Sequence, residues 1–286
     1  MKIIKFFSDY AMTDKIINTY FSIDELFLDK DYNVTYRFTI DDDYTHAIII
    51  NKASPELKIS KENVVGIAHE PPEFLNLTPG ENIDTNFINY VTKYVGKYYI
   101  GEKYNLPEEF IEGNGYVGHC SLPRTIINKN KIMSIMISQK MFTGGHNYRH
   151  QLANIIIQNK LPIDIYGYGC KLYEPNELLK GEFNGNEHIE NYLFHIAIEN
   201  TQHPHYFTEK IKNPLLYGTN VLYLGCTNIF NYFSSEGIYL LTGNVESDMN
   251  LIVNILNDWQ KYYKLIDTQK ISNSLSIKNL INQINF

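Results

Sequence analysis

The residues best suited to chemistry lie where a predicted strand over 192–198 is followed by a polar loop and by a helix that begins at Thr208. Threonine is a common N-cap, and the helix dipole favours a carboxylate in the first turn, here Glu209. The same helix start would favour a bound phosphate beside the mobile positive charge of Lys210, and Glu209 could accept hydrogen bonds from ribose hydroxyls. The pattern therefore predicts a nucleotide site, with a plain capped helix and solvated charges as the alternative.

A second signal is a carboxylate at the end of a predicted strand over 64–68. Pro71 and Pro72 cannot continue a central strand, so the chain must leave the sheet directly after Glu70. Open α/β sheets place their ligands at the carboxyl ends of their strands. Glu70 is therefore a candidate site residue and Glu73, three residues on, is its rival. A turn carboxylate without a role is the remaining alternative.

The elements that must position these residues alternate between strands and helices, which predicts an α/β fold with mostly parallel sheets. In the first half we expect strands at 2–7, 33–40, 46–50, 64–68 and 97–100, and helices at 13–28 and 87–95. In the second half we expect strands at 131–137, 163–166, 192–198, 220–224 and 238–241, and helices at 146–160, 208–217, 249–263 and 272–284. A glycine-rich linker over 113–124 separates the halves, so the pattern predicts two successive Rossmann-like units.

Composition disfavours several classes of protein. The 286 residues include 25 Lys and Arg against 32 Asp and Glu, a net charge of −7, which argues against nucleic acid as the main partner. Hydrophobic residues make up 44% and charged residues 20%, as in a globular protein. No apolar run approaches the roughly 20 residues of a membrane span, and the apolar start is too short for a signal peptide. We therefore expect a soluble, cytoplasmic protein.

The spacing of the cysteines and the lack of common cofactor motifs disfavour further classes of protein. Cys120, Cys170 and Cys226 lie far apart without CxxC spacing, which argues against a disulfide framework or a thiolate zinc site. We expect them to be small buried side chains in a reducing compartment. The chain also lacks a dinucleotide-binding GxGxxG after a strand, a Walker sequence and a GxSxG elbow, so dehydrogenase, P-loop kinase and α/β-hydrolase functions are disfavoured.

Several spaced segments resemble glycosyltransferase family 10, the α-1,3-fucosyltransferases. In that family a strand ending in Phe-Glu-Asn is followed by Tyr-x-Thr-Glu-Lys, and Ile198–Asn200 and Tyr206–Lys210 follow that order here. A helix and a short strand ending in Gly come next, as in the family. Upstream, Tyr148–Arg149 near the start of a helix and Ile163–Gly167 also agree, so the resemblance extends over about 132–233 and fades in the N-terminal half.

The resemblance implies a GT-B fold, in which two Rossmann-like domains face a central cleft. The domains would be 1–125 on the acceptor side and 126–286 on the nucleotide-sugar side, with the last helix packing back on the first domain. The resemblance also implies a nucleotide-sugar donor, GDP-fucose, a glycan acceptor and no metal. The implied donor-binding residues are Arg149, Tyr206 and Lys210 at the diphosphate, Glu209 at the ribose, Asn200 on the donor side and Thr208 at the helix start.

A catalytic base is implied as well. The family has a Glu in a Gly-Glu-Asn-like turn, and Glu70 stands at the matching place here, between His69 and Pro71. Glu70 would remove the acceptor proton in a single inverting displacement, while Arg149 and Lys210 stabilise the charge that develops on the leaving diphosphate.

Three other groupings have the spacing of sites. Asp41–Asp43 resembles the metal-binding motif of the other large glycosyltransferase fold, but we expect a solvated loop. His146 and His150 have the i,i+4 spacing of zinc ligands without the Glu of HExxH, so we expect helix-surface histidines, with a phosphate or acceptor contact ahead of zinc. His203 and His205 lie in the donor loop, either as donor contacts or as exposed residues.

Two rival functions stay open. Tyr168 stands where the family more often has a basic residue, and Ile198 replaces the usual Phe, so the same fold could use another nucleotide sugar. A non-catalytic nucleotide- or glycan-binding protein would keep Glu209 and Lys210 but would need no base, and Glu70 argues against it. Composition and architecture fit a cytoplasmic enzyme of bacterial or large-virus origin.

Overall fold

The computed structural model describes residues 2–12, 15, 36–114 and 128–274, which fall into two compact units. Unit 1 lies within Met1–Cys120 and also includes the loop His203–Tyr206 and the end of the last described helix. Unit 2 lies within Ser121–Gln202 and Phe207–Ser272. The domain boundary expected at 125 falls outside the described residues. Each unit is built on its own six-stranded sheet, and every described strand pair is parallel.

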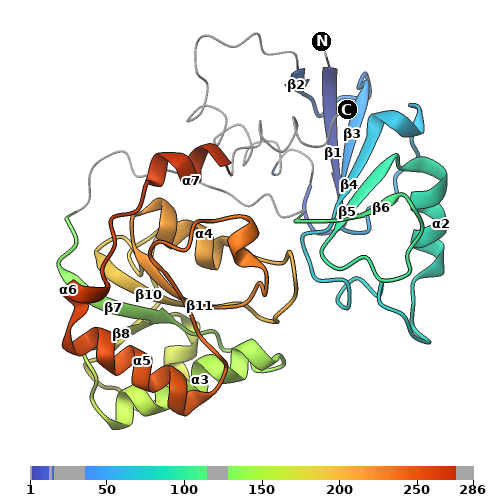
Figure 1. The fold of residues 1–286 in the computed structure, drawn as a ribbon. Coiled ribbons are helices and arrows are strands. Elements are labelled where there is room, and N and C mark those ends of the chain that lie inside the picture. Colours follow the sequence, from blue (N-terminus) through green and yellow to red (C-terminus); the bar gives the residue numbers. More distant parts are fainter. Residues whose placement is uncertain (1, 13–14, 16–35, 115–127, 275–286) are drawn as a thin grey trace. The chain divides into compact units, whose positions relative to one another are not determined.

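Unit 1 has the strand order β2-β1-β3-β4-β5-β6. Its elements are β1 (Lys2–Ser8), β2 (Tyr36–Phe38), β3 (His46–Ile50), η1 (Lys61–Asn63), β4 (Val64–Ile67), α2 (Thr85–Tyr94), β5 (Lys97–Ile100) and β6 (Phe110–Glu112). β3 and β4 are buried along almost their whole length, which is why they read in the sequence as continuous apolar runs. Helix α2 lies beside this sheet (Figure 1). It begins after Asp84, whose side chain accepts a hydrogen bond from the backbone N–H of Phe87, and its buried Phe87 and Val91 belong to the core of the unit.

Unit 2 has the strand order β12-β11-β10-β7-β8-β9. Its elements are β7 (Lys131–Met136), α3 (Gly144–Gln158), β8 (Ile163–Tyr166), η2 (Tyr168–Leu172), β9 (Leu179–Gly181), β10 (Tyr192–Ile198), α4 (Glu209–Leu216), β11 (Asn220–Leu224), η3 (Ile229–Asn231), β12 (Ile238–Leu240), α5 (Val245–Asn257) and α6 (Trp259–Tyr262), followed by α7 (Thr268–Ser274). Helices α3 and α5 cover one face of this sheet and α4 covers the other (Figure 1). Ile135, Ile165 and Ile196 lie in the core that the sheet forms with α3 and α5.

Both sheets reverse their strand order beside the first strand of the unit. In unit 1 the chain continues from β1 to β2 on one side and to β3 on the other, and in unit 2 β7 stands in the same way between β8 and β10. Such a reversal leaves a crevice outside the carboxyl ends of the strands, where open α/β sheets bind their ligands. We call these two places the ligand edges of unit 1 and unit 2.

The α/β fold class with two Rossmann-like domains is confirmed, and several strands have the bounds expected from the sequence. The structure adds β6, η2 and β9, which the sequence pattern did not predict. The single helix expected over 249–263 is wrong, because Asp258 has φ −145° and ψ 58°, outside the helical region, and separates α5 from α6. Three expectations lie wholly or largely outside the described residues: the helix at 13–28, the linker at 113–124 and the final helix at 272–284.

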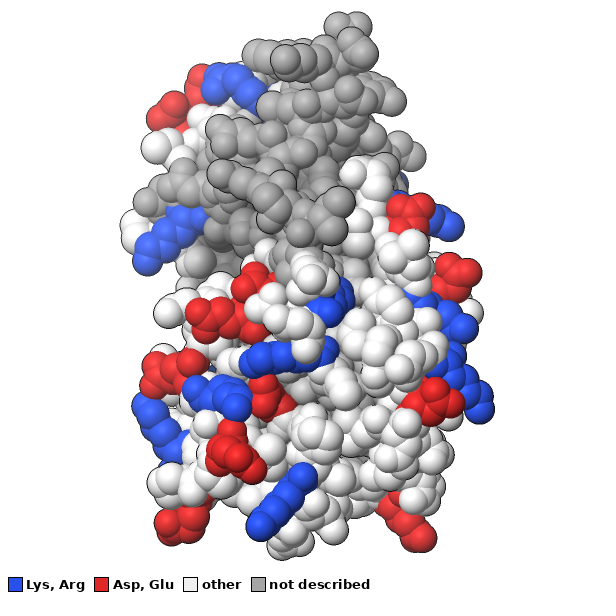
Figure 2. All heavy atoms as spheres, turned by 90° about the vertical axis from the view of Figure 1, so that its left-hand side faces the viewer, with Lys and Arg blue, Asp and Glu red and all other residues white. Residues whose placement is uncertain are grey.

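The described residues include no helix long and apolar enough to cross a membrane. Figure 2 shows acidic and basic side chains interspersed on one face, without an extended patch of either sign.

Candidate functional site

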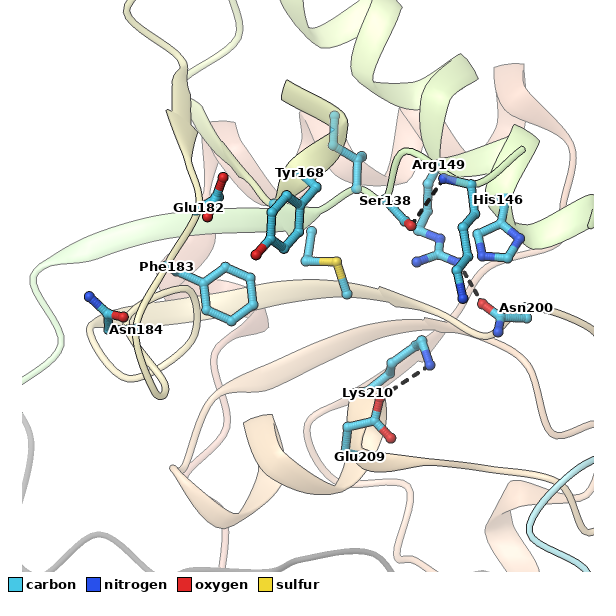
Figure 3. A pocket seen from close by; sticks show the side chains of 14 residues that line it. Ser138, His146, Arg149, Tyr168, Glu182, Phe183, Asn184, Asn200, Glu209 and Lys210 are labelled. Atoms are coloured by element: carbon cyan, nitrogen blue, oxygen red, sulfur yellow. Dashed lines mark hydrogen bonds and ion pairs between the residues drawn. The ribbon is translucent and has the colours of Figure 1, made fainter. Parts of the chain in front are cut away.

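A pocket of about 670 Å³ lies at the ligand edge of unit 2. It gathers residues that follow the carboxyl ends of β7 to β10 and residues from the first turns of α3 and α4 (Figure 3). The lining residues are Met136, Ile137, Ser138, Lys140, His146, Arg149, Gly167, Tyr168, Glu182, Phe183, Asn184, Asn200, Glu209 and Lys210. The volume falls within the range of about 300–1,000 Å³ typical of small-molecule sites.

Arg149 and Asn200 form one end of this pocket. Arg149 is only 2% exposed, and its guanidinium donates hydrogen bonds to Asn200 Oδ1 at 2.8 Å and, through Nε, to the Gly145 carbonyl at 3.1 Å. These bonds fix a planar cation at the pocket wall (Figure 3). A guanidinium held in one orientation suits the oxygens of a phosphate, which its fork can bind in pairs.

The first turn of α3 packs directly on the end of β10. The Gly145 N–H donates to the Asn200 carbonyl at 3.0 Å, and a Cβ at Gly145 would lie 1.8 Å from the Glu199 carbonyl oxygen. Only glycine fits there, so this residue serves a close approach between two backbone segments of the protein. A Cβ at Gly144, by contrast, would meet nothing within 4 Å.

Behind the pocket, Glu199 is a buried carboxylate whose role the sequence pattern does not indicate. It is 1% exposed and accepts hydrogen bonds from the Thr208 backbone N–H at 2.8 Å and from the Thr208 hydroxyl at 2.7 Å. The Lys210 ammonium lies 3.5 Å from its second oxygen. A buried carboxylate that is hydrogen-bonded and paired in this way fixes the start of α4 to the end of β10. Thr208 is the N-cap of α4, as predicted.

Lys210 brings a second cation to the pocket. Its Nζ lies 3.1 Å from the Thr208 hydroxyl and 3.3 Å from Glu209 Oε1. Burial opposes the charge, but Glu199 and Glu209 outweigh burial and hold the pKa of Lys210 above its ordinary value. Lys210 therefore stays protonated at neutral pH. Glu209 lines the pocket with its side chain 46% exposed, so its carboxylate is accessible from the pocket.

His146 lies in the same pocket as a neutral group. Burial, together with the charges of Arg149, Lys140 and Lys210, lowers the pKa of His146 to about 4. This effect of neighbouring cations on a titrating group indicates a positive potential that would favour a bound anion. The expectation of a helix-surface histidine is wrong, because the first turns of α3 pack into the sheet edge and leave His146 4% exposed.

The same packing buries His150, which is 5% exposed. Its Nε2 lies 2.7 Å from the Ser138 carbonyl and its Nδ1 lies 2.6 Å from the Tyr173 hydroxyl. His150 therefore joins α3 to the loop after β7, and the expectation of an exposed residue is wrong here too. The part of the chain that the structure describes contains no group of three or more side chains suited to hold a metal.

The opposite end of the pocket is aromatic. Tyr168 at the start of η2 and Phe183 after β9 lie there, with Glu182 and Asn184 on either side of Phe183 in the chain (Figure 3). Lys171 pairs with Glu182 at 2.6 Å, and its ammonium lies 5.1 Å from the centroid of the Tyr168 ring. Sequence reasoning named Tyr168 but missed Glu182, Phe183 and Asn184, because β9 is too short to produce a periodic pattern.

Gly167 lines the pocket and turns the chain from β8 into η2. Its φ of 105° is one that side chains rarely adopt, and a Cβ there would lie 2.2 Å from the Ile137 carbonyl oxygen. The glycine therefore lets the ends of β7 and β8 approach each other and brings Tyr168 to the pocket.

At the ligand edge of unit 1, Glu70 is exposed in the turn after β4. The preceding residue, His69, donates its backbone N–H to Asn51 Oδ1 at 2.8 Å, and its Nδ1 lies 3.0 Å from the Tyr10 hydroxyl. Asn51 has φ 51°, and its carbonyl accepts a hydrogen bond from Tyr98 at 2.8 Å. The turn that presents Glu70 is thus anchored through both the backbone and the imidazole of His69.

The loop His203–Tyr206, which precedes α4, belongs to unit 1 and contacts Glu73, the rival of Glu70 as the catalytic base. His203 Nε2 lies 2.5 Å from Glu73 Oε1, and His205 Nε2 lies 3.4 Å from Glu112 Oε1. Tyr206, in the same loop, is 7% exposed and does not line the unit 2 pocket. Glu73 is therefore engaged in an ion pair with His203, and Glu70, three residues earlier, is an exposed residue.

The structure brings together only part of the predicted set. In the unit 2 pocket lie Arg149, Asn200, Glu209, Lys210, His146 and Gly167, whereas Thr208 lies behind it and Glu70, Glu73, His203 and Tyr206 belong to unit 1. Asp42 and Asp43 pair with Lys5 at 2.7 Å and with Arg37 at 3.6 Å. Cys170 and Cys226 are buried free thiols, and Cys120 lies outside the described residues.

Comparison with known proteins supports the resemblance drawn from the sequence. The family model "Glycosyltransferase family 10 (fucosyltransferase) C-term" matches residues 126–240. The curated protein Alpha-(1,3)-fucosyltransferase B of Drosophila melanogaster is 27% identical over 139 residues, which are 45% of this chain and 31% of that protein. The chain thus spans about a third of the length of this relative. The match to the family 10 motif is confirmed over this region.

Solved structures resemble the whole architecture. An α1,3-fucosyltransferase crystallised with GDP has a TM-score of 0.54 at 12% identity, covering 98% of this chain and 90% of that chain. S. aureus TarM, in a complex with UDP, has a TM-score of 0.55 at 10% identity, covering 84% and 55%. The DNA-modifying β-glucosyltransferase has a TM-score of 0.52 at 11% identity and covers both chains fully, 100% and 100%. These likenesses establish the GT-B fold.

Proposed function

We propose that this chain is a glycosyltransferase that moves fucose from GDP-fucose to a hydroxyl of a glycan acceptor. The observation that carries the proposal is the pair of cations, Arg149 and Lys210, at the ligand edge of the unit that matches the family 10 model. The fucosyltransferase names of the relatives and the GDP in one structural neighbour support this donor. The net charge of −7 supports a glycan acceptor over nucleic acid.

The donor would bind with its diphosphate at the charged end of the pocket. Arg149 presents its fork, Lys210 presents its ammonium, and the start of α4 contributes its backbone N–H groups. Glu209 would accept hydrogen bonds from the ribose, and Asn200 would hold the Arg149 guanidinium in place. Thr208 would cap the helix whose first N–H groups meet the diphosphate. Tyr206 is proposed as a diphosphate ligand only because of the resemblance to family 10.

The reaction would be a single displacement with inversion at the anomeric carbon. Glu70 of unit 1 would take the proton of the acceptor hydroxyl while that oxygen bonds to the anomeric carbon, and the bond from this carbon to the diphosphate would break. Its electron pair would go to GDP, where Arg149 and Lys210 stabilise the new charge. A positioned base contributes about 10²–10⁴ in rate. Because protein cations face the leaving group, the proposed reaction uses no metal.

The location of the reaction is a further part of the proposal. Among the described residues, both cysteines are buried free thiols, which fits a reducing compartment. We therefore infer a cytoplasmic enzyme.

Calorimetry with GDP and UDP in the presence of a chelator, followed by transfer assays with nucleotide sugars and a panel of glycans, tests the proposal. We expect GDP to bind and fucose to be transferred without added metal. A preference for UDP would favour another nucleotide sugar. A strict need for magnesium or manganese would contradict the metal-free reaction. Nucleotide binding without transfer from any donor would favour a non-catalytic binding protein.

A further inference from the structure

We propose that the aromatic end of the unit 2 pocket reads guanine, with Glu182 accepting hydrogen bonds from the N1–H and the exocyclic amino group of the base, which stacks against Tyr168. The inference rests on the proposed function, because it assigns the base end of the nucleotide whose diphosphate meets Arg149 and Lys210.

The first argument is the order of chemical groups along the pocket. Figure 3 shows Arg149 toward one end of the pocket, Tyr168 and Phe183 toward the other, and Lys210 with Glu209 beside it below them in this view. A nucleoside diphosphate has charged phosphates at one end, a flat base at the other and a ribose with hydroxyls between them. A ligand that places its phosphates on the cations would therefore extend its base toward the rings.

The second argument is the state of the two rings. Tyr168 lines the pocket and is 58% exposed, so its ring is accessible to a ligand in the pocket. Phe183 is held from behind, since its ring centroid lies 3.9 Å from that of His188 and it makes an edge contact with Tyr166. An accessible ring beside a fixed one gives a base a surface on which to stack.

The third argument is the charge state of Glu182. Its hydrogen bond with Lys171, at 2.6 Å, lowers the pKa of the carboxyl, so the side chain is ionised at neutral pH and can only accept hydrogen bonds. Guanine places two N–H donors side by side on one edge. Adenine and cytosine place an amino group beside a bare ring nitrogen, and uracil places one N–H between two carbonyl oxygens. Each of these three would bring an acceptor against the carboxylate, and guanine alone would not.

Calorimetry with GDP, inosine diphosphate, ADP and UDP tests the inference without relying on turnover. Inosine diphosphate differs from GDP only in lacking the exocyclic amino group. We expect the wild-type protein to bind GDP roughly tenfold or more tighter than inosine diphosphate, the effect of one hydrogen bond to a charged group. Glu182→Gln should bring the two affinities close together and should not weaken UDP binding, because it removes the carboxylate that would face a carbonyl oxygen of uracil. Tyr168→Ala should weaken both purine nucleotides.

Glu174→Gln is the matched control, because Glu174 is an exposed carboxylate of the same segment that does not line the pocket. Its preference for GDP should equal that of the wild type. A Glu182→Gln variant that keeps the full preference for GDP over inosine diphosphate would overturn the inference.

The two proposals can fail separately. If all four diphosphates bind with similar affinity and Arg149→Ala weakens all of them, the guanine-reading inference is wrong and the nucleotide site stands. If the wild-type protein binds none of them, both proposals are overturned.

Discussion

The two ligand edges of this molecule share a sheet topology and hold their polar side chains by different means. At the edge of unit 2, the cations are largely buried and held by contacts: Arg149 is hydrogen-bonded to Asn200, and Lys210 lies beside the enclosed carboxylate of Glu199. These side chains have little freedom, so their charges are already in place before a ligand arrives.

At the edge of unit 1, the described contacts of the turn include two hydrogen bonds of His69, one at its backbone N–H and one at its buried imidazole. Asn51 and Tyr10 hold His69, and the neighbouring Glu70 remains exposed. The difference fits two chemical tasks. Stabilising a leaving anion needs fixed cations, because reorienting them would cost part of the stabilisation, whereas a base needs a rigid turn and an accessible carboxylate.

The largest effect is expected at Glu70. Glu70→Gln keeps the size of the side chain and its hydrogen-bonding reach but cannot take a proton, so transfer should fall by roughly 10²-fold or more while GDP affinity stays near that of the wild type. Single-turnover assays and calorimetry on the same preparations measure both quantities. Glu73→Gln should keep most activity. If the two variants exchange behaviour, Glu73 is the base, and if both stay active, the base is another residue.

An added methyl group where α3 meets β10, as in Gly145→Ala, should distort the ligand edge of unit 2. In Gly145→Ala the new Cβ would lie 1.8 Å from the Glu199 carbonyl oxygen, so the backbone must shift. We expect a loss of about 1–3 kcal/mol in the free energy of unfolding, together with much weaker GDP binding. Urea denaturation and calorimetry measure these effects. Gly144→Ala is the control, because its Cβ would meet nothing within 4 Å. Equal behaviour of the two variants would contradict the account of this junction.

Removing one cation at a time tests whether the unit 2 edge serves a diphosphate. Arg149→Ala and Lys210→Ala should each weaken GDP binding by about 1.5–3 kcal/mol, the range of charge-assisted hydrogen bonds. Guanosine, which lacks phosphates, should bind these variants and the wild type with similar affinity. Equal losses for guanosine and GDP would mean that the two residues maintain the fold and do not contact phosphate.

The smallest expected effect of a substitution is a change in the slope of stability against pH in unit 2. Burial and neighbouring cations lower the pKa of His146 to about 4, and burial alone lowers that of His188 to about 4, whereas an unfolded histidine titrates near 6.5. Between about pH 6.5 and 4 the unfolded state binds more protons, so stability falls as the pH is lowered, by at most about 1.4 kcal/mol per pH unit for each group. His146→Gln should make the slope shallower in urea denaturation series. An unchanged slope would contradict a neutral, buried His146.

Much of the fold could be predicted because its buried parallel strands are continuous apolar runs. Strands such as Ile163–Tyr166 and Tyr192–Ile198 begin and end where the apolar residues do. Strand β9 could not be found in this way, since the three residues Leu179–Gly181 acquire their conformation by pairing with β8. The helix break at Asp258 could not be predicted either, because the spacing of apolar residues continues across it.

The candidate site could be predicted where local chemistry shows in the chain, as in the helix start at Thr208. Glu199 was missed because a carboxylate after a strand gives no sign of whether it is buried. His146 and His150 were expected on a helix surface, because their spacing describes one helix face and says nothing of what packs on it. The aromatic end of the pocket depends on short elements that tertiary contacts position.

The contact between α3 and β10 also determines at which stage of folding the unit 2 pocket can form. The Arg149–Asn200 hydrogen bond joins residues 51 positions apart, and Gly145 meets Asn200 across a similar stretch of chain. The charged end of the pocket is therefore absent until β10 has docked beside β7, a pairing between strands that lie far apart in the sequence. A nucleotide that needs this end binds only the completed unit. At a concentration one hundred times its Kd it would add about 2.7 kcal/mol to stability by mass action, so the supply of this nucleotide would help to set how much folded protein a cell retains.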